Sequence, residues 1–325
     1  MERFGGGRVI AIMALASVYW SRRRFRQAHK AAARKRDGKR MGMNGSVVGF
    51  ASGKRGFRQW MALAVLVPAV FLGACSSDDP ELNYDERPVE QIYNRAVDYL
   101  NDNKYRQAAA EFDEVERQHP YSQWARRAML MSAFCYYETN DYDSAILAAQ
   151  RFIALHPGNE DAAYAYYLVG ISFYEQISDV GRDQGMTQNA LATLSEVVRR
   201  FPDTEYARDA RLKIDLTVDH LAGKEMEIGR YYLNQHAYVA AINRFRAVVT
   251  NYQTTTHVPE ALHRLTEAYV SLGIVPEAQT AAAVLGHNFP GSGWYEDSYA
   301  LLADNDLEPR ENQDSWISKA WKSVF

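Results

Sequence analysis

Apolar positions recur with a helical period along most of the chain from residue 88 onward. One order of residue types repeats, with variations, five times: a small residue, an aromatic residue three positions later, a polar turn, an alanine, an apolar position and a proline. Positions three and four apart share one face of an α-helix, so each copy predicts two amphipathic helices joined by a turn.

The five copies stand in register with one another. Their marker residues are Ala96, Tyr99, Tyr105, Ala108, Phe112, Val115 and Pro120; Ala133, Tyr136, Tyr142, Ala145, Ala149, Phe152 and Pro157; Gly170, Phe173, Ala190, Leu194, Val197 and Pro202; Gly229, Tyr232, Tyr238, Ala241, Phe245 and Val248; and Tyr269, Ala278, Leu285 and Pro290. The third copy contains an insertion, which we place in the polar segment Glu175–Met186. The fourth has Gln253 at the proline position and extra length in Tyr206–Lys224, which we expect to form one long helix.

Packing explains these residue types. We expect the small residue of the first helix to meet the alanine of the second, because larger side chains would hold the two backbones apart. Proline ends the second helix, since it lacks an N–H group and clashes with the preceding turn. One hairpin cannot bury its apolar face alone, so several must stack. The pattern is the tetratricopeptide (TPR) signature. It predicts an all-α fold, an α-solenoid of about five TPR-like helical hairpins, rather than an ordinary helical bundle.

A short apolar run precedes the repeats. Residues 60–72 follow three basic residues, an arrangement typical of a secretory signal and too short to span a membrane. The run leads into Gly73-Ala74-Cys75, which resembles the lipobox of bacterial lipoproteins. The resemblance implies diacylglycerol and acyl chains such as palmitate on Cys75, and no other cofactor. Ser76 then implies an outer-membrane location on the periplasmic face. The alternative is an ordinary signal with an incidental cysteine.

Charge is unevenly distributed. Residues 1–60 carry 15 of the 37 Lys and Arg residues but 2 of the 40 acidic ones, which leaves an acidic body. Because phosphate binding needs clustered bases, the body is not expected to bind nucleic acid. We interpret residues 1–42 as an over-extended gene start or a disordered basic leader, with Met41 or Met43 as the start. Nucleic-acid or membrane-surface binding by its run Arg22–Arg40 is the alternative.

These patterns divide the chain into six segments. They are the leader 1–42, a lipoprotein signal peptide at 43–74, a lipid-anchored acidic linker at 75–88, repeats one to three at 89–203, repeats four and five with the long helix at 204–302, and a linker with a C-terminal amphipathic helix at 303–325.

The anchor, the linker and the looped third repeat, taken together, resemble the BamD family of β-barrel assembly lipoproteins. The stretches that carry the resemblance are Ile92-Tyr93, Tyr105-Arg106-Gln107-Ala108, Gln150-Arg151-Phe152-Ile153, Val198-Arg199-Arg200-Phe201-Pro202 with Thr204-Glu205-Tyr206, and Tyr231-Tyr232 with Ala237-Tyr238-Val239-Ala240. The match covers roughly residues 75–290. His220 and Gly223 depart from the larger or charged residues expected at their positions.

The family resemblance implies a role and partners. The role is that of a periplasmic subunit of the barrel-assembly machine, which also contains other lipoproteins. Its C-terminal repeats would dock the POTRA domains of the barrel-forming subunit, and its N-terminal repeats would receive the C-terminal strand of unfolded outer-membrane β-barrel clients. The alternative is another TPR-type lipoprotein or periplasmic coordinator of the cell envelope or of division.

Two sets of side chains are candidates for binding. Tyrosines on first helices suit a groove that meets extended peptides, because they offer large contact area and a hydroxyl; these are Tyr93, Tyr137, Tyr164, Tyr166 and Tyr167. Charged residues at helical spacing in the long helix and fourth repeat suit partner docking; these are Arg208, Arg211, Lys213, Asp215, Asp219, Arg230 and Arg244. The alternatives are inter-repeat packing for the tyrosines and a solvated face for the charges.

The C-terminal tail predicts a third candidate element. Residues 314–325 place Trp316, Trp321 and other apolar residues on one helical face, with two lysines opposite and Phe325 at the end. Such a helix could cap the last repeat, bind a partner groove or lie on the membrane.

Catalysis is not supported by any motif. The sequence has no nucleophile elbow, no phosphate-binding loop, no metalloprotease helix and no zinc-spaced cysteine set. His119 and His156 precede helix-ending prolines and are interpreted as turn residues. Cys135, among aromatic residues, is interpreted as a small buried apolar residue. We therefore expect a binding protein rather than an enzyme.

Overall fold

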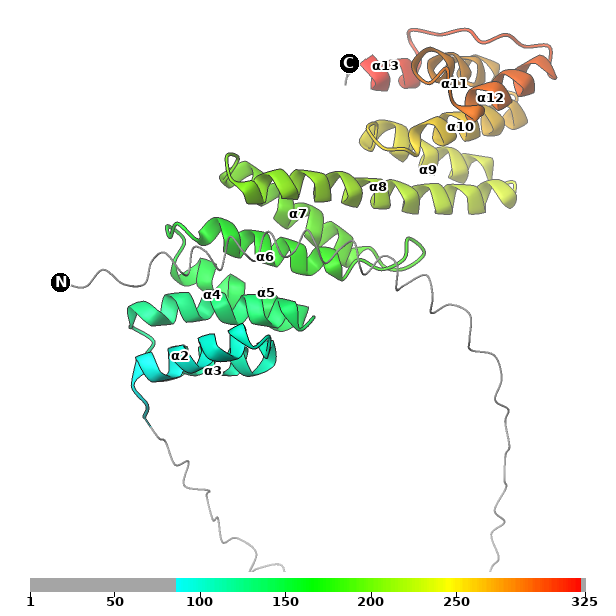
Figure 1. The fold of residues 1–325 in the computed structure, drawn as a ribbon. Coiled ribbons are helices and arrows are strands. Elements are labelled where there is room, and N and C mark those ends of the chain that lie inside the picture. The colour runs from blue at the N-terminus through cyan, green and yellow to red at the C-terminus, as the bar shows by residue number, and fades with distance from the viewer. Residues whose placement is uncertain (1–85, 323–325) are drawn as a thin grey trace, which may run out of the picture. The chain divides into compact units, whose positions relative to one another are not determined.

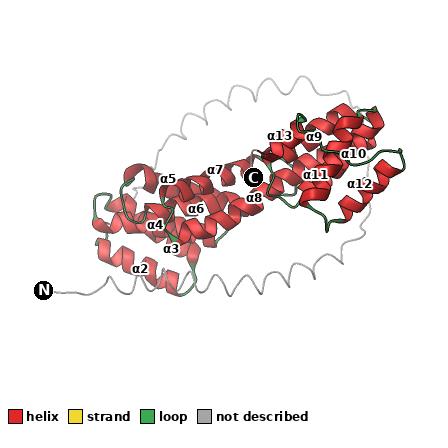
Figure 2. Ribbon diagram, turned by 90° about the horizontal axis from the view of Figure 1, so that it is seen from above, coloured by secondary structure: helices red, strands yellow, loops and turns green. Residues whose placement is uncertain are grey.

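The computed structural model describes residues 86–322, and all regular structure within them is helical (Figures 1 and 2). The described residues belong to one compact unit, Asn83–Phe325. The predicted leader, the signal peptide, Cys75 and Phe325 lie outside the described residues.

Twelve helices make up the described part. They are α2 (Val89–Asn101), α3 (Tyr105–Gln118), α4 (Gln123–Glu138), α5 (Tyr142–Leu155), α6 (Ala162–Glu175), α7 (Gly185–Arg200), α8 (Glu205–Asn234), α9 (Tyr238–Asn251), α10 (Val258–Leu272), α11 (Val275–Asn288), α12 (Gly293–Ala303) and α13 (Trp316–Lys322). Each of α2 to α11 packs on the next helix, and α2, α4, α6 and α8 also contact one another in turn. The predicted stack of five hairpins is confirmed: α2–α3, α4–α5, α6–α7, the second half of α8 with α9, and α10–α11 (Figure 1).

The second helix of every hairpin ends in the same way. Each ends two residues before the predicted proline or Gln253, and the intervening residue has φ between −134° and −129° and ψ between 40° and 58°. Proline excludes the helical conformation from the residue before it, which explains four of the five ends. Tyr252 adopts the same conformation before Gln253, so the packing of the repeats also favours this end without proline.

The turns inside four hairpins share a left-handed residue two positions before the second helix. These residues are Asn103, Asn140, His236 and Gly273, with φ between 57° and 71°. Asparagine and glycine tolerate this conformation. The hydroxyl groups of Tyr105 and Tyr142 donate to Asn103 and Asn140 at 3.0 and 2.9 Å. The aromatic residue at the start of the second helix therefore also stabilises the turn.

Close approach inside the third and fourth hairpins favours glycine. A Cβ atom at Gly170 would lie 2.7 Å from Leu194 Cδ2, and one at Gly229 would lie 2.4 Å from Phe245 Cε1. The small residues were expected to meet the alanines Ala190 and Ala241. That expectation needs correction, because the nearest atoms belong to the residue one helical turn farther along, where the larger side chain fills the space that glycine leaves.

Helix α8 is longer than predicted. It begins at Glu205, where the Thr204 side chain accepts a hydrogen bond from the Ala207 N–H, and runs 30 residues to Asn234 without a break. The predicted long helix and the first helix of the fourth hairpin are thus one element. Ala210, in its first half, belongs to the core of the preceding repeats, whereas Ala222 and Met226 belong to the core of the following ones.

The insertion in the third repeat is the loop between α6 and α7, as predicted. The amide of Gln184 donates to the carbonyl groups of Arg182 and Val180, and the Lys224 ammonium of α8 donates to the Gly181 carbonyl at 3.1 Å. These bonds hold the loop against the middle of α8.

Replacing Gly229 by alanine should destabilise the protein. The new methyl group would collide with the rigid Phe245 ring, and overpacking of this kind lowers the free energy of unfolding by about 1–3 kcal/mol. Gly170→Ala should have a smaller effect, because the Leu194 side chain can rotate. Gly158→Ala is the control, since nothing lies within 4 Å of its Cβ position. Urea unfolding followed by circular dichroism measures the three differences, and equal stability of all three variants would contradict the packing described here.

Candidate partner-binding surfaces

Two of the five candidate groove tyrosines are buried. Tyr93 is 5% exposed and packs on Phe112 and Trp124, with ring centroids 5.5 and 4.7 Å apart. Tyr167 is 7% exposed. The prediction that they line an open groove is corrected for these two residues, because both rings fill space between helices.

The other three tyrosines keep part of their rings at the surface. Tyr137 and Tyr164 lie on α4 and α6, and the Tyr164 ring meets the Tyr206 ring at a tilt of 44°, with the ring centroids 5.3 Å apart. The Arg200 guanidinium lies over the Tyr166 ring at 5.1 Å. The structure thus leaves half-buried aromatic surface on the first helices of the second and third hairpins.

Lys213 is not at the surface. Its side chain is 3% exposed, and its ammonium donates to Asp209 Oδ2 at 2.6 Å. The same carboxylate oxygen accepts from the Tyr167 hydroxyl at 2.5 Å, and the ammonium also lies 5.6 Å from the centre of the Tyr174 ring. The prediction that Lys213 docks a partner is therefore corrected, because this ammonium ties α8 to α6.

The remaining charges in the first half of α8 are exposed. Arg208, Arg211 and Asp215 lie on one face, and Arg211 donates to the Pro202 carbonyl at 3.1 Å. The same face carries Leu212 and Leu216, which are 65% and 60% exposed. The candidates chosen by charge did not include these two leucines. Two leucines one helical turn apart can nevertheless be recognised in the sequence as a possible apolar contact surface.

The middle of α8 explains one departure from the family pattern. A Cβ atom at Gly223 would lie 3.2 Å from His257 Nε2 and 3.4 Å from Val180 Cγ1. Glycine is favoured because the insertion loop and the α9–α10 turn both approach the helix at this point. One turn earlier, Asp219 Oδ1 accepts from the N–H and the hydroxyl of Thr256 at 3.0 and 2.8 Å. Asp219 therefore anchors a turn of the fold.

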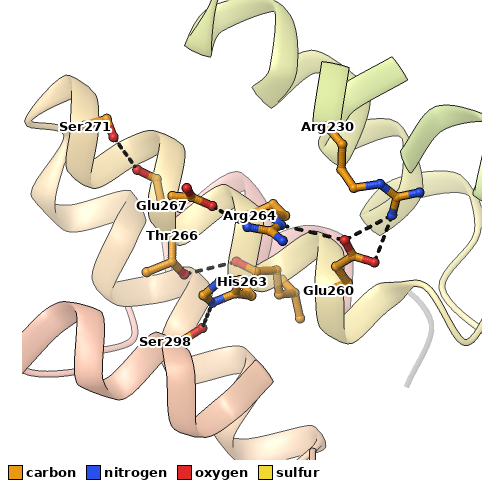
Figure 3. Close-up of polar contacts among 9 residues, drawn as sticks. Arg230, Glu260, His263, Arg264, Thr266, Glu267, Ser271 and Ser298 are labelled. Carbon is orange, nitrogen blue, oxygen red and sulfur yellow. Dashed lines mark hydrogen bonds and ion pairs between the residues drawn. The ribbon is translucent and has the colours of Figure 1, made fainter. Parts of the chain in front are cut away.

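The two predicted arginines of the fourth hairpin are paired with glutamates. Arg230 of α8 contacts both carboxylate oxygens of Glu260 on α10 at 3.0 Å, as Figure 3 shows. Arg264 continues the network to Glu267 at 2.8 Å (Figure 3). Arg244 of α9 pairs with Glu225 at 3.2 Å. Both predicted arginines are partly exposed, so each can contact a partner while it holds its glutamate.

His263 links α10 to α12. Its Nδ1 hydrogen-bonds the Ser298 hydroxyl at 2.9 Å (Figure 3), and its ring lies 5.2 Å from that of Trp294. The residue is 8% exposed. Burial, and then the neighbouring Arg264 charge, lower the pKa of His263 from its usual 6.5.

The tail helix α13 packs on α9 and α11. Its Trp316 indole donates to the Tyr269 hydroxyl at 3.1 Å, and the Trp321 ring meets Phe289 edge to face at 5.7 Å. Ile317 is fully buried, whereas Lys319 and Lys322 are exposed. The apolar face predicted from the sequence is thus turned toward the last repeats.

Residues 86–322 offer neither a metal-binding cluster nor a membrane-spanning helix. No group of three or more His, Cys, Asp or Glu side chains is placed to hold a metal ion in this part. Of the helices described there, none combines the length and apolar character needed to cross a membrane.

Comparison with known proteins gives consistent matches over the repeats. Residues 85–285 match the family model YfiO, described as an outer membrane lipoprotein. Three relatives carry the name outer membrane protein assembly factor BamD. The Caulobacter vibrioides protein is 54% identical over 247 residues, covering 76% of this chain and 81% of that protein. The Rickettsia prowazekii protein is 45% identical, covering 74% and 95%. A Neisseria meningitidis protein is 35% identical, covering 68% and 88%.

Removing the Asp209 carboxylate should destabilise the contact between α6 and α8. Asp209→Ala leaves the buried Lys213 ammonium without its nearest anion, which lowers the free energy of unfolding by roughly 3 kcal/mol. The double variant Asp209→Leu with Lys213→Met should be more stable than Asp209→Ala, because it buries no unpaired charge. Chemical denaturation of the single and double variants tests the pair. With the single variants Asp209→Leu and Lys213→Met added, the cycle is complete, and additive effects of these two changes would show that the side chains are not coupled.

Acid should weaken the attachment of α12. The pKa of His263 is lowered in the folded protein, so below pH 6.5 the unfolded chain binds a proton that the folded chain does not. The free energy of unfolding should therefore fall as the pH drops from about 6.5 through the folded pKa. Urea unfolding at about pH 7.5 and about pH 5 should show a smaller difference in His263→Gln than in the parent. The exposed His287→Gln is the control, and an identical loss in both variants would contradict the assignment.

Proposed function

Because the chain belongs to the BamD family of outer-membrane lipoproteins and is an outer membrane protein assembly factor, we propose that it acts as a lipid-anchored scaffold on the periplasmic face. In this proposal the C-terminal repeats dock the POTRA domains of the barrel-forming subunit. The N-terminal repeats receive unfolded β-barrel clients. Other lipoprotein subunits of the machinery bind the same scaffold.

The anchor follows from the sequence around Cys75. An apolar run, small residues and a cysteine stand in the order that lipoprotein processing requires, and the matched family is described as a lipoprotein. Several acyl chains on one terminus hold a protein on a bilayer far more firmly than one chain does. Ser76 favours transfer to the outer membrane. Only a short linker separates the lipid anchor at Cys75 from the first hairpin, so the repeats would stay near the membrane.

Client binding is supported by the half-buried tyrosines of α4 and α6. Tyr137, Tyr164 and Tyr166 offer aromatic surface whose position neighbouring rings and Arg200 already restrict. A surface with few freely rotating side chains loses little entropy when an extended peptide binds. Tyrosine also provides a hydroxyl for the polar backbone of such a peptide.

Docking of the barrel-forming subunit is supported by the charged surface of the fourth and fifth hairpins. Arg230 and Arg244 are 41% exposed, and each is held by a glutamate of the same chain. An arginine held in this way needs less reordering when it meets a carboxylate of a partner. The observation that carries the proposal is the family match, which runs from residue 85, before α2, to residue 285 in α11.

Isolation of the full-length protein from membranes tests this function. The tagged wild-type chain should be found in the outer-membrane fraction and, after gentle detergent extraction, should co-purify with a barrel protein that carries POTRA domains. Cys75→Ala should be lost from the outer-membrane fraction, because it carries no acyl anchor, yet the purified variant should still bind the purified POTRA domains. Recovery of division or cell-wall proteins in place of the barrel subunit would contradict the proposal. Persistent palmitate labelling of Cys75→Ala would overturn the anchor.

A further inference from the structure

The stripe of α8 that packs against α9 continues beyond the end of α9. In the second half of α8, the residues facing α9 are Ala222, Met226, Gly229 and Leu233, all buried. Their spacing of four and three residues is that of one helix face. The same spacing, followed toward the N-terminus, reaches Asp219, Asp215, Leu212 and Arg208.

No helix of the described chain covers this continuation. Helix α9 is 14 residues long, and the turn after it already meets α8 at Asp219 through Thr256. The first half of α8 buries its opposite face against α6 and α7; the residues on that buried face are Ala207, Ala210, Lys213 and Thr217. Leu212 and Leu216 therefore stand 65% and 60% exposed, one helical turn apart.

The charges beside these leucines show which partner would fit. Arg208 and Arg211 lie toward the N-terminal end of the stripe, and Asp215 lies between the leucines. Neither Arg208 nor Asp215 forms an ion pair with any described residue, and Arg211 donates only to a backbone carbonyl. A partner that presented carboxylates at the arginine end would neutralise both guanidinium groups.

We propose that the first half of α8 docks a single amphipathic helix of another protein, antiparallel to α8 and in line with α9. The partner helix takes the place of the second helix that this half of α8 lacks. Its apolar residues pack on Leu212 and Leu216, and acidic residues near its C-terminal end face Arg208 and Arg211. The inference rests on the proposed scaffold function and names a surface and a class of partner for it.

Site-specific photocrosslinking tests the occupant. A photoreactive amino acid is placed at position 212 or 216 of the full-length, membrane-anchored protein in the cells that make it. Positions 147 and 155 on α5 are controls, because Leu147 and Leu155 are 65% and 59% exposed. The expected product joins α8 to a segment of a different protein that is helical, amphipathic and acidic near its C-terminal end. Crosslinks to a second copy of this chain, to its own residues 1–85, to a non-helical segment, or no more product than at the controls would each overturn the proposal.

Paired substitutions test the chemistry of the surface. Leu212→Glu with Leu216→Glu should reduce the yield of the crosslinked partner in co-purification by about tenfold or more, as expected for the loss of two apolar anchor residues. Leu147→Glu with Leu155→Glu should leave the yield unchanged. Arg208→Glu with Arg211→Glu should also reduce it, whereas Arg208→Lys with Arg211→Lys should retain most of it. Equal thermal unfolding of all four double variants shows that each one folds.

The outcomes distinguish failure of the docking inference from failure of the scaffold function. If wild-type protein recovers the POTRA-containing barrel subunit and the α8 variants lose no partner at all, the docking inference is wrong and the scaffold function stands. If wild-type protein recovers no component of the assembly machinery, the scaffold function itself is wrong.

Discussion

The apolar face of each hairpin is too large for one pair of helices to hide, and its burial against the next pair is the constraint on which the described fold depends. Phe112 and Phe245 occupy equivalent positions on their second helices, Phe152 lies about one helical turn farther along its own, and each is at most 1% exposed. Their rings can be buried because a small residue on the first helix lets the backbones come close, most clearly at Gly229. The same turns and helix ends recur in successive hairpins because they keep the small residue of the first helix opposite the large residue of the second.

Helix α8 shows how the same constraint leaves apolar side chains exposed. A hairpin stack ordinarily gives every first helix a second helix as its partner. The 30 residues of α8 serve two cores in succession, but α9 covers only the later half. The earlier half is held on one side by α6 and α7 and by the Tyr167–Asp209–Lys213 contact. Rigid support on one face and open apolar side chains on the other are what a docking surface needs.

Much of this architecture could be predicted from residue spacing, because spacing fixes which residues share a helix face. The five hairpins, the looped third repeat and the long helix follow from it, and so does the apolar face of α13. Spacing does not say which face another helix covers. Lys213 and Arg208 are both charged residues of α8, yet one is buried and the other is exposed, and only the positions of α6 and α7 distinguish them.

Other features escaped prediction because they depend on segments distant in sequence. Gly223 departs from the family pattern for a reason that becomes visible only when Val180 and His257 approach it from two sides. Helix α12 carries no repeat signature, and its place on α10 and α11 depends on contacts such as that of Ser298 with His263. The buried tyrosines could not be separated from the half-buried ones for the same reason.

The position of α13 shows how the last hairpin is covered. Stacked hairpins leave an apolar face at each end of the stack, which a capping element must cover. Here α12 lies over α10 and α11, while α13 crosses back onto α9 and α11 and inserts Ile317 and Trp321. The last hairpin thus buries apolar surface against α12 and α13 of its own chain.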